Sequence, residues 1–316
     1  MTSTLRRLLA LIPTLLGVTL LTFFLMKLTP GDPVRMMAGP EASPEDLERL
    51  RHKLGLDRPL WIQYGSYLGG VVRGDLGTSL TTRRPVTEEI LARLPATIEL
   101  AAAAMFFAIL TGLLGGVLSA VHPRSALDHS TRIGVFVFLA MPSFWLGLEL
   151  IILFSRHLGW FPPAGRGRPW MPSMFGHLTL PALTLGVGTG AFLCRILRSS
   201  MLQVLNMDYV RTARAKGLDS NRVILKHALR NALIPFVTVA GISMGTLLGG
   251  SVIVETVFNW PGVGKLLVDS IKERNFSVTM GCVLVLAVVF VLVNGLIDLL
   301  YVAIDPRIRL EGKEKA

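Results

Sequence analysis

The sequence predicts an all-α integral membrane protein with six transmembrane helices and a small extracytoplasmic segment after the first helix. Of its 316 residues, 51% are hydrophobic and only 17% are charged, and the mean hydropathy is +0.56. A soluble domain carries about 25% charged residues. The charge deficit falls in long, nearly uncharged stretches, and a helix needs about 20 such residues to cross a hydrocarbon core about 30 Å thick.

Six apolar runs are the candidate spans. They cover residues 8–26, 100–121, 133–154, 178–194, 232–254 and 278–304. The first run is longer than the ~7–15 residues of a signal-peptide core, and no small-residue cleavage site follows it, so we expect an uncleaved anchor. The fourth run is the weakest, because it is short and rich in glycine.

Lysine and arginine predict the orientation of these spans, because short cytoplasmic loops are enriched in both. With six spans, sixteen basic residues fall on the side of the termini and six in the short loops on the other side. We therefore expect both termini in the cytoplasm. This asymmetry also accounts for the net charge of +11 without a nucleic-acid partner, and it leaves membrane lipid as the expected surrounding.

Residues 29–95 are predicted to form the extracytoplasmic segment. Ser43 and Pro44 are typical of a helix start, and that helix is expected to run to Leu54 and stop at Gly55. A second helix is expected over 59–68, a turn over 74–77 and a short helix over 87–94 that leads into the second span. The predicted divisions are the N-terminus with the first span, 1–28, the extracytoplasmic segment, 29–95, a transmembrane domain with the other five spans, 96–310, and a cytoplasmic tail, 311–316.

Enzyme signatures are absent from the sequence. It holds no His-Glu-x-x-His and no Cys-x-x-Cys, and its two cysteines lie in apolar stretches, so a disulfide is not expected. The stretch 262–265 (GVGK) resembles part of a phosphate-binding loop, but Asn259 stands where that loop needs glycine and Leu266 where it needs Ser or Thr. We expect no catalytic residue, cofactor or metal in this chain, and no ATP hydrolysis by it.

The loop 195–231 is the most informative part of the chain. It is dense in arginine and lysine, so one interpretation is a positive-inside tether that touches anionic lipid. The order of its residues indicates a defined structure as well as a positive charge. Residues 207–216 favour a helix, Gly217 is typical of a left-handed helix end, and Asp219 or Ser220 can cap a second helix running to about Leu233, before Pro235. A helix, a glycine turn and a helix form a shape that can dock a partner protein.

The segments 211–217 (RTARAKG) and 227–235 (HALRNALIP) resemble the cytoplasmic coupling loop of binding-protein-dependent ABC importer permeases. The resemblance is to the B-type permeases of the dipeptide, oligopeptide and nickel branch. In the general pattern the loop opens with Glu-Ala, where this chain has Arg211 and Thr212. Further matching segments occur in order along nearly the whole chain: 29–33 (TPGDP), 54–59 (LGLDRP), 74–79 (GDLGTS), 93–97 (RLPAT), 255–264 (ETVFNWPGVG) and 305–307 (DPR).

The resemblance implies a type I ABC importer permease of the bacterial inner membrane that imports peptides or a related small solute by alternating access. The implied partners are a second, C-type permease subunit, one or two ATPase subunits that bind ATP and Mg²⁺, and an extracytoplasmic substrate-binding protein. The residues implied in coupling to the ATPase are Arg211, Ala213, Ala215, Lys216, Gly217 and Arg222. Dipeptide, oligopeptide, nickel and glutathione remain open as substrates.

Several further residues are candidates outside this loop. Glu149 lies inside an apolar run, and it is predicted either to face the pathway or to pair with Arg156 or Arg166. Asp298 is interpreted as structural. Trp260, Pro261 and Gly262 are predicted either to form a turn or to contact the binding protein. Two sets of glycines recur every four residues and predict close helix packing: Gly186 and Gly190, and Gly241, Gly245 and Gly249.

Two other classes compete with an ABC permease. A membrane-embedded enzyme needs a cluster of catalytic residues at membrane depth, and the sequence has none. A secondary transporter would work alone and needs inverted repeats and several buried acids, whereas the apolar runs offer only Glu149 and Asp298.

Overall fold

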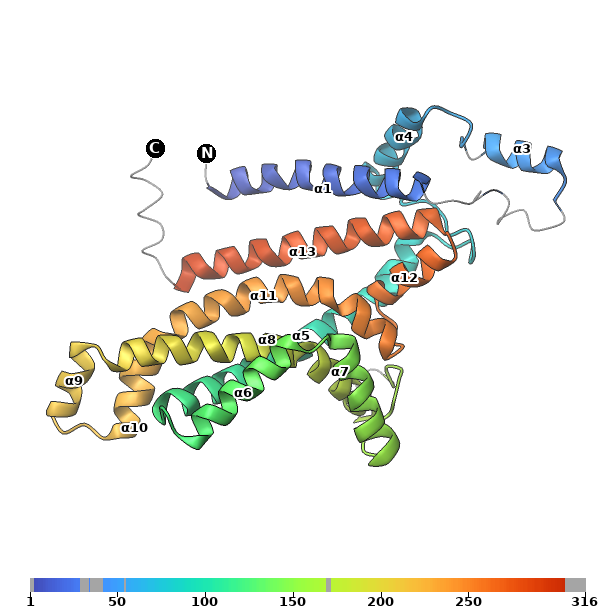
Figure 1. Cartoon of the computed structure of the whole chain (residues 1–316). Coiled ribbons are helices and arrows are strands. Elements are labelled where there is room, and N and C mark those ends of the chain that lie inside the picture. Colours follow the sequence, from blue (N-terminus) through green and yellow to red (C-terminus); the bar gives the residue numbers. More distant parts are fainter. Residues whose placement is uncertain (1–2, 29–33, 35–41, 54, 169–171, 305–316) are drawn as a thin grey trace. The chain divides into compact units, whose positions relative to one another are not determined.

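The structure of the chain is a computed structural model that describes residues 3–28, 34, 42–53, 55–168 and 172–304 (Figure 1). Within these ranges every regular element is helical, apart from one isolated bridge between Thr78 and Pro85. The chain divides into two compact units. Unit 1 contains residues 1–97 and 261–291, and unit 2 contains residues 98–260 and the stretch from 292 onwards.

Unit 1 contains α1 (Ser3–Leu28), α3 (Pro44–Lys53), α4 (Leu60–Val72), the first part of α5 (Val86–Val121), α12 (Val263–Lys272) and most of α13 (Phe276–Ile304). Its core gathers residues from the segment after α4, from α5, from α12 and from α13: Leu76, Val86, Ile90, Val263, Leu266, Val278, Cys282 and Leu284. Asn275 fixes the loop before α5 to the start of α13. Its side chain accepts from Leu80 N at 3.2 Å and donates to Ser79 Oγ at 2.9 Å.

The helices predicted between residues 43 and 68 are confirmed within a few residues. Ser43 Oγ accepts from Asp46 N at 3.2 Å at the start of α3, and Gly55 has a φ of +65° just beyond its end. α4 runs four residues further than predicted, to Val72. The expected turn is present, where Gly77 N donates to Asp75 Oδ1 at 2.8 Å.

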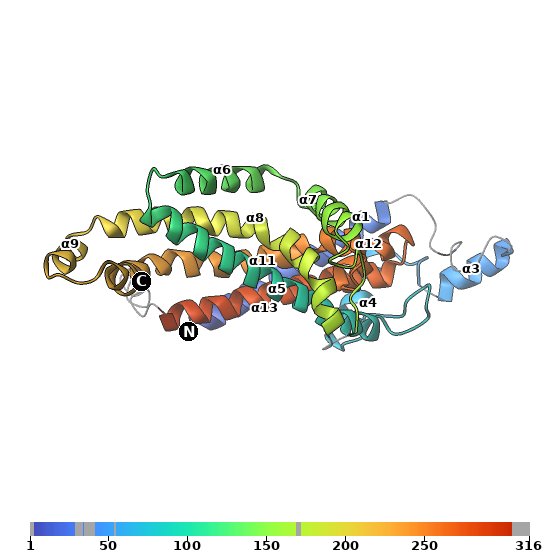
Figure 2. The ribbon, with the colours of Figure 1, turned by 90° about the horizontal axis from the view of Figure 1, so that it is seen from below.

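Unit 2 contains the rest of α5, α6 (Ala126–Ala140), α7 (Ser143–Leu150), the π-helical η1 (Ile151–His157), α8 (Pro172–Leu205), α9 (Asp208–Ala215), α10 (Ser220–Arg222), the π-helical η2 (Val223–Leu229) and α11 (Arg230–Val257). α8 is the central helix and packs against α6, α7 and α11 (Figures 1 and 2). α5 also crosses α8 closely, since a β-carbon on Gly112 would stand 2.7 Å from Leu193 Cβ and one on Gly116 2.8 Å from Leu197 Cβ.

The predicted glycine packing is confirmed for one helix only. A β-carbon on Gly186 would overlap the Ala104 carbonyl oxygen, and one on Gly190 would overlap the Thr111 hydroxyl, so both glycines permit the contact between α8 and α5. Gly249 on α11 has nothing within 4 Å of such a carbon. The recurrence of glycine on α11 therefore does not mark a close helix contact at that position.

Four helices in the described part of the chain are long and apolar enough to cross a membrane: Val86–Val121, Ser173–Leu205, Ser220–Val257 and Phe276–Ile297. The bent pair Ala126–Ala140 and Ser143–His157 adds a fifth if it crosses as one span. The apolar stretch Pro13–Leu28 within α1 is shorter than these helices. The count of six and the location of 29–95 outside the membrane stay predictions. The tail 311–316, the motifs 29–33 and 305–307, and the side chain of Asp298 lie outside what the structure describes.

Two predicted helices have different bounds in the structure. The third run was expected to be one helix, but it bends by 109° between α6 and α7. Met141 is extended there (φ −83°, ψ 124°), because Pro142 disfavours a helical residue before it. The short helix expected over 87–94 is instead the first part of α5, which continues through Pro95.

Candidate functional site

The loop between α8 and α11 folds into a helical hairpin. We call residues 206–229 the coupling hairpin. It consists of α9, a turn at Gly217, α10 and η2. It lies at one end of α8, while α7 lies towards the other end (Figures 1 and 2). The sequence predicted this helix–turn–helix arrangement.

The turn of the hairpin depends on the conformation of Gly217. Its φ is +76°, in the left-handed region that glycine tolerates best. Gly217 N donates to Arg214 O at 2.9 Å, and Leu218 N reaches back to Ala213 O at 3.4 Å. These two bonds form a Schellman motif, which satisfies carbonyl groups at the end of α9. Asp219 then caps the next helix, since its side chain accepts from Asn221 N at 3.0 Å. The predicted left-handed helix end at Gly217 and the predicted cap at Asp219 are both confirmed.

The two arms of the hairpin are held together by a small apolar interior. Its buried residues are Val210 and Ala213 on α9 and Val223 on η2, and Leu218 packs against them from the turn. Ala213 is only 7% exposed. We predicted that Ala213 takes part in coupling, but its side chain faces the interior of the hairpin. In this conformation it supports the hairpin and is not accessible to a partner.

The remaining predicted coupling residues lie on the outside of the hairpin. They are Arg211, Ala215, Lys216, Gly217 and Arg222, and all are exposed. Arg214 is exposed beside them. Arg211 has one contact within its own helix, to Asp208 at 3.6 Å, and an exposed pair of this kind contributes little. The outer face of the hairpin is therefore a positively charged surface available to a partner.

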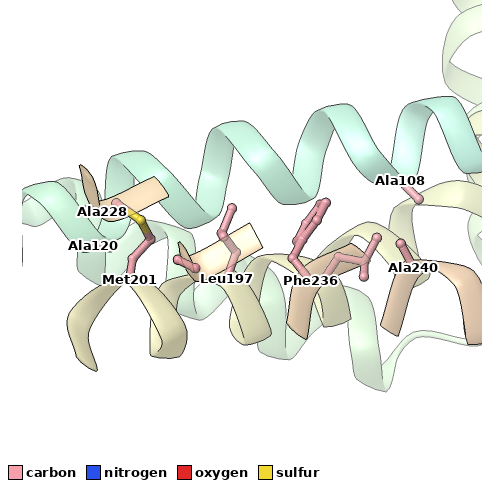
Figure 3. Close-up of a cluster of buried hydrophobic side chains, with 9 residues drawn as sticks. Ala108, Ala120, Leu197, Met201, Ala228, Phe236 and Ala240 are labelled. Atoms are coloured by element: carbon pink, nitrogen blue, oxygen red, sulfur yellow. The ribbon is translucent and has the colours of Figure 1, made fainter. Parts of the chain in front are cut away.

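An apolar cluster connects the hairpin to the long helices. Its buried residues come from α5, α8, η2 and α11: Ala108, Ala120, Leu193, Leu197, Met201, Ala228, Ala232, Phe236 and Ala240. In Figure 3 Met201 lies near Ala228, and Leu197 and Phe236 follow along the same seam. Ala228 on η2 is fully buried in this cluster, so the second arm of the hairpin is packed onto α8 and α5.

The second arm does not end where the sequence predicted. A helix ending near Leu233, before Pro235, was expected, but the helical stretch continues from Ser220 to Val257. Proline removes one backbone donor inside a helix. Membrane helices tolerate that loss because neighbouring groups compensate for it. The arm is therefore continuous with α11, and a displacement of the hairpin has a direct helical connection to the fifth predicted span.

A buried ion pair beside the hairpin was missed by the sequence analysis. Asp128 on α6 is 1% exposed, and Arg198 on α8 donates to its two oxygens at 2.7 and 2.9 Å. Ser119 Oγ donates to Asp128 at 2.5 Å, and Arg124 N donates at 3.0 Å. The pair ties α5, α6 and α8 together two turns before α8 reaches the hairpin. The available signal was Asp128 three residues after the capping Ser125.

A hollow of about 320 Å³ lies elsewhere in unit 2, between the bend after α6, α8 and α11. Apolar side chains and several hydroxyl groups line it. The hydroxyl groups belong to Ser143, Thr184, Thr189 and Thr246. Hydroxyl groups at membrane depth can solvate a polar solute. This hollow is the candidate part of a substrate pathway that this chain contributes.

Glu149 does not line that hollow and is exposed on α7. Its predicted structural pairing with Arg166 is not present, because Arg166 donates to the two carboxylate oxygens of Glu99 at 2.6 and 3.0 Å instead. Among the described residues Glu149 has no ion pair. Its role in the pathway stays a prediction.

Two of the three residues of the predicted outer turn are buried. Trp260 is fully buried and Gly262 is buried, while Pro261 is partly exposed. Trp260 N donates to Glu255 O at 2.8 Å, which closes the end of α11. Glu255 is also fully buried, and the sequence analysis gave it no role of its own. Contact with a binding protein stays a prediction. In this conformation Pro261 is the most accessible of the three predicted residues.

The comparisons with known proteins decide the family. The family described as binding-protein-dependent transport system inner membrane component matches residues 112–310, and its N-terminal family matches residues 1–101. The chain belongs to this permease family. It is 47% identical to the di/tripeptide transport system permease protein DppB of Pseudomonas aeruginosa, over 96% of this chain and 97% of the relative.

Other relatives of this permease agree. It is 46% identical to the dipeptide transport system permease protein DppB of Escherichia coli K12, over 96% of this chain and 98% of the relative. It is 45% identical to the glutathione transport system permease protein GsiC of E. coli O6:H1, over 96% and 97%. It is therefore a Dpp-type permease of an ABC importer, a multi-pass protein of the inner membrane.

Solved structures support the fold of this permease. An inward-facing structure of the MetNI methionine ABC transporter matches with a TM-score of 0.57 at 24% identity, over 69% of this chain and 96% of that one. An amino acid ABC transporter matches with a TM-score of 0.53 at 18% identity, over 68% and 94%. The prediction of the type I importer permease fold is confirmed. Its family works with ATPase subunits and a substrate-binding protein.

Proposed function

We propose that this permease imports short peptides, a class that includes glutathione, together with a second permease subunit of the C type. The support is the set of relatives named for di/tripeptide, dipeptide and glutathione transport at 45–47% identity over nearly the full chain. Substrate reaches the pair from an extracytoplasmic binding protein. ATP and Mg²⁺ bind in one or two partner ATPase subunits, and this chain holds neither.

The coupling hairpin is the proposed contact with the ATPase. The observation that carries this proposal is its position at the end of α8, a helix of 34 residues. Such a helix is about 51 Å long, whereas a hydrocarbon core is about 30 Å thick. The helix therefore extends about 20 Å beyond the hydrocarbon core in total. A hairpin on such an extension is better placed to meet a cytoplasmic subunit than to lie on the lipid surface.

The exposed residues of the hairpin then have distinct roles. Arg211, Lys216 and Arg222 supply positive charge that favours an acidic groove on the ATPase. Ala215 and Gly217 leave the tip narrow, because neither carries a long side chain. Ala213 contributes indirectly, by packing the two arms together.

Alternating access follows from the way the hairpin is attached. Closure of the ATPase subunits on ATP displaces the hairpins, and the continuous helix from Ser220 to Val257 transmits that movement towards the hollow lined by hydroxyl groups. In this proposal both termini are cytoplasmic. The hollow faces the substrate, and Glu149 is a further candidate to meet a substrate amine.

The test is uptake by the complete importer in proteoliposomes. Labelled dipeptide and labelled glutathione are offered with the binding protein outside and ATP inside. We expect peptide uptake that requires both ATP and the binding protein. Uptake driven by a proton gradient without ATP would contradict the proposal, and so would a binding protein that retains nickel but no peptide.

A further inference from the structure

The helix α4 differs from the rest of the predicted extracytoplasmic segment because it carries no charged side chain. None of its residues is buried within the protein. Its large apolar side chains are exposed instead. Leu60 is 40% exposed, Trp61 76%, Ile62 43% and Val72 88%. In water Leu60, Trp61 and Ile62 would form an exposed apolar patch, of the kind that marks contact with a membrane or another protein.

Contacts with α1 place α4 below the outer end of the first span. Tyr64 Oη donates to Leu16 O at 3.2 Å and lies 3.0 Å from Thr19 Oγ1. The Tyr64 ring also packs against Phe23, with 5.5 Å between the ring centroids. Thr19 lies nine residues before Leu28, the last residue of α1, and that distance corresponds to about 13 Å along a helix.

The face of α1 turned away from α4 is apolar and exposed. Leu21 is 63% exposed, Phe24 44% and Leu25 55%. These residues belong to a span of a membrane protein, so lipid is their ordinary surrounding. α4 therefore packs against a helix that meets lipid on its exposed face. A water-soluble binding protein cannot reach this depth, because it docks from outside the bilayer.

The length and the ends of α4 determine how it lies. Its 13 residues extend about 20 Å, too short to cross a hydrocarbon core of about 30 Å. Arg58 precedes it and Arg73 follows it, so both ends need water or lipid headgroups. In Figure 1 α4 stands at a steep angle to α1. A helix at such an angle to a span lies close to the plane of the membrane.

A pocket of about 480 Å³ beside α4 supplies polar groups towards the outer end of α1. Lys27, Arg58 and Tyr67 line it, together with Phe23 and Phe276. Lys27 Nζ lies 5.1 Å from the Phe276 ring centroid, and no carboxylate pairs with it among the described residues. Tyr67 Oη is buried with no hydrogen-bond partner in the described part of the chain. Cations and phenol groups next to an apolar helix are typical of the depth of lipid phosphates.

We propose that α4 is an interfacial helix embedded in the outer leaflet, with Leu60, Trp61 and Ile62 in contact with phospholipid. It lies close to the membrane plane, among the acyl chains of the outer leaflet and below the headgroups. Lys27 and Arg58 reach towards the phosphates. The segment 29–95 is then not wholly aqueous, and it is fixed to the membrane at a second point besides α1.

Spin labelling of the complete importer in lipid tests this proposal. A nitroxide is attached at Trp61→Cys or Val72→Cys, and its collisions with oxygen and with a water-soluble nickel chelate are measured. Leu21→Cys on α1 is the lipid reference, and Glu48→Cys on the exposed face of α3 is the water reference. The native Cys194 and Cys282 are buried, and the unsubstituted importer gives their background.

We expect both α4 positions to favour oxygen over the nickel chelate, as position 21 does, and to report similar depths. An upright helix would separate the two depths by about 16 Å, because the two labels are eleven positions apart. A preference for the nickel chelate at both positions, as at position 48, would overturn the proposal by placing α4 in water. Low collision rates with both reagents would overturn it by showing that protein, such as the second permease, covers the helix.

Discussion

Gly217→Val tests the coupling hairpin at its most demanding position. Gly217 has a φ of +76°, and a β-carbon built on it meets nothing within 4 Å. A β-carbon at this position therefore creates no steric overlap with the rest of the protein. Its cost comes from the backbone conformation alone, which a β-branched residue tolerates poorly.

The size of the effect follows from that conformation. A left-handed backbone costs an L-residue about 1–2 kcal/mol, and Val is expected towards the upper end. A change of that size alters an equilibrium about 5–30-fold. The two bonds that close the turn, from Gly217 N and Leu218 N, are lost when the turn opens. Docking of the hairpin should weaken by up to that factor, because only the closed turn is competent to bind.

The assay compares the complete importer with and without the substitution. Gly217→Val should reach the membrane in normal amounts, because Gly217 is exposed and outside the apolar clusters. Substrate-stimulated ATP hydrolysis and uptake should both fall sharply, and fewer ATPase subunits should co-purify. Gly217→Ala should be less severe. Arg222→Ala should be milder still, since an exposed charge contributes little.

Gly74→Val is the matched control. Gly74 has a φ of +78°, and a β-carbon on it also meets nothing within 4 Å, so the local strain is the same. It lies in the segment after α4, which is predicted to be outside the cytoplasm, so ATPase co-purification should be unchanged. Full coupled activity in Gly217→Val would refute the reasoning, and so would an equal loss of co-purified ATPase in Gly74→Val.

Four further results are expected. Asp128→Asn leaves Arg198 without its counter-charge and should lower the melting temperature of the importer. The loss of folding free energy should stay below the ~3–5 kcal/mol that breaking a fully buried pair costs, because the Arg198 side chain is 25% exposed. Gly186→Ala should destabilise the protein by about 1–3 kcal/mol through overlap with α5, while Gly249→Ala leaves the melting temperature unchanged. Glu149→Gln should reduce uptake without affecting assembly. A reporter that is active only in the cytoplasm should stay silent when fused after Arg73.

Each of these expectations has a contrary outcome. Equal melting temperatures for Asp128→Asn and the natural protein would mean that the ion pair does not hold α6 to α8. A stable Gly186→Ala variant would show that α5 can move away from α8 at little cost. Unchanged uptake in Glu149→Gln would remove that residue from the pathway, and reporter activity after Arg73 would contradict the predicted topology.

The coupling hairpin was largely predictable because its signals are local. Gly217 at the end of α9 and Asp219 at the start of α10 act through bonds to residues within a few positions, so the sequence alone contains the information. The extent of the second arm was not predictable in the same way. Pro235 is a helix breaker in water, and its tolerance here depends on the packing of α11 among other helices.

Long-range pairs escaped the sequence analysis for a related reason. Asp128 and Arg198 are 70 positions apart, and Glu99 and Arg166 are 67 apart. Nothing in their local pattern states which partner each will meet. The burial of Ala213 was missed because a small residue is equally common on either face of a short helix. The bend after Met141, in contrast, had a signal in Pro142 that the continuous apolar run obscured.

Photo-crosslinking from the hairpin tip tests the central claim most directly. A photoreactive residue replaces Lys216, which is exposed, in the complete importer in native membranes, and the same residue at Glu48 on α3 is the control. We predict an adduct between position 216 and an ATPase subunit, and none from position 48. Adducts from position 216 to lipid alone would contradict the account, because the hairpin would then be a basic tether on the membrane surface.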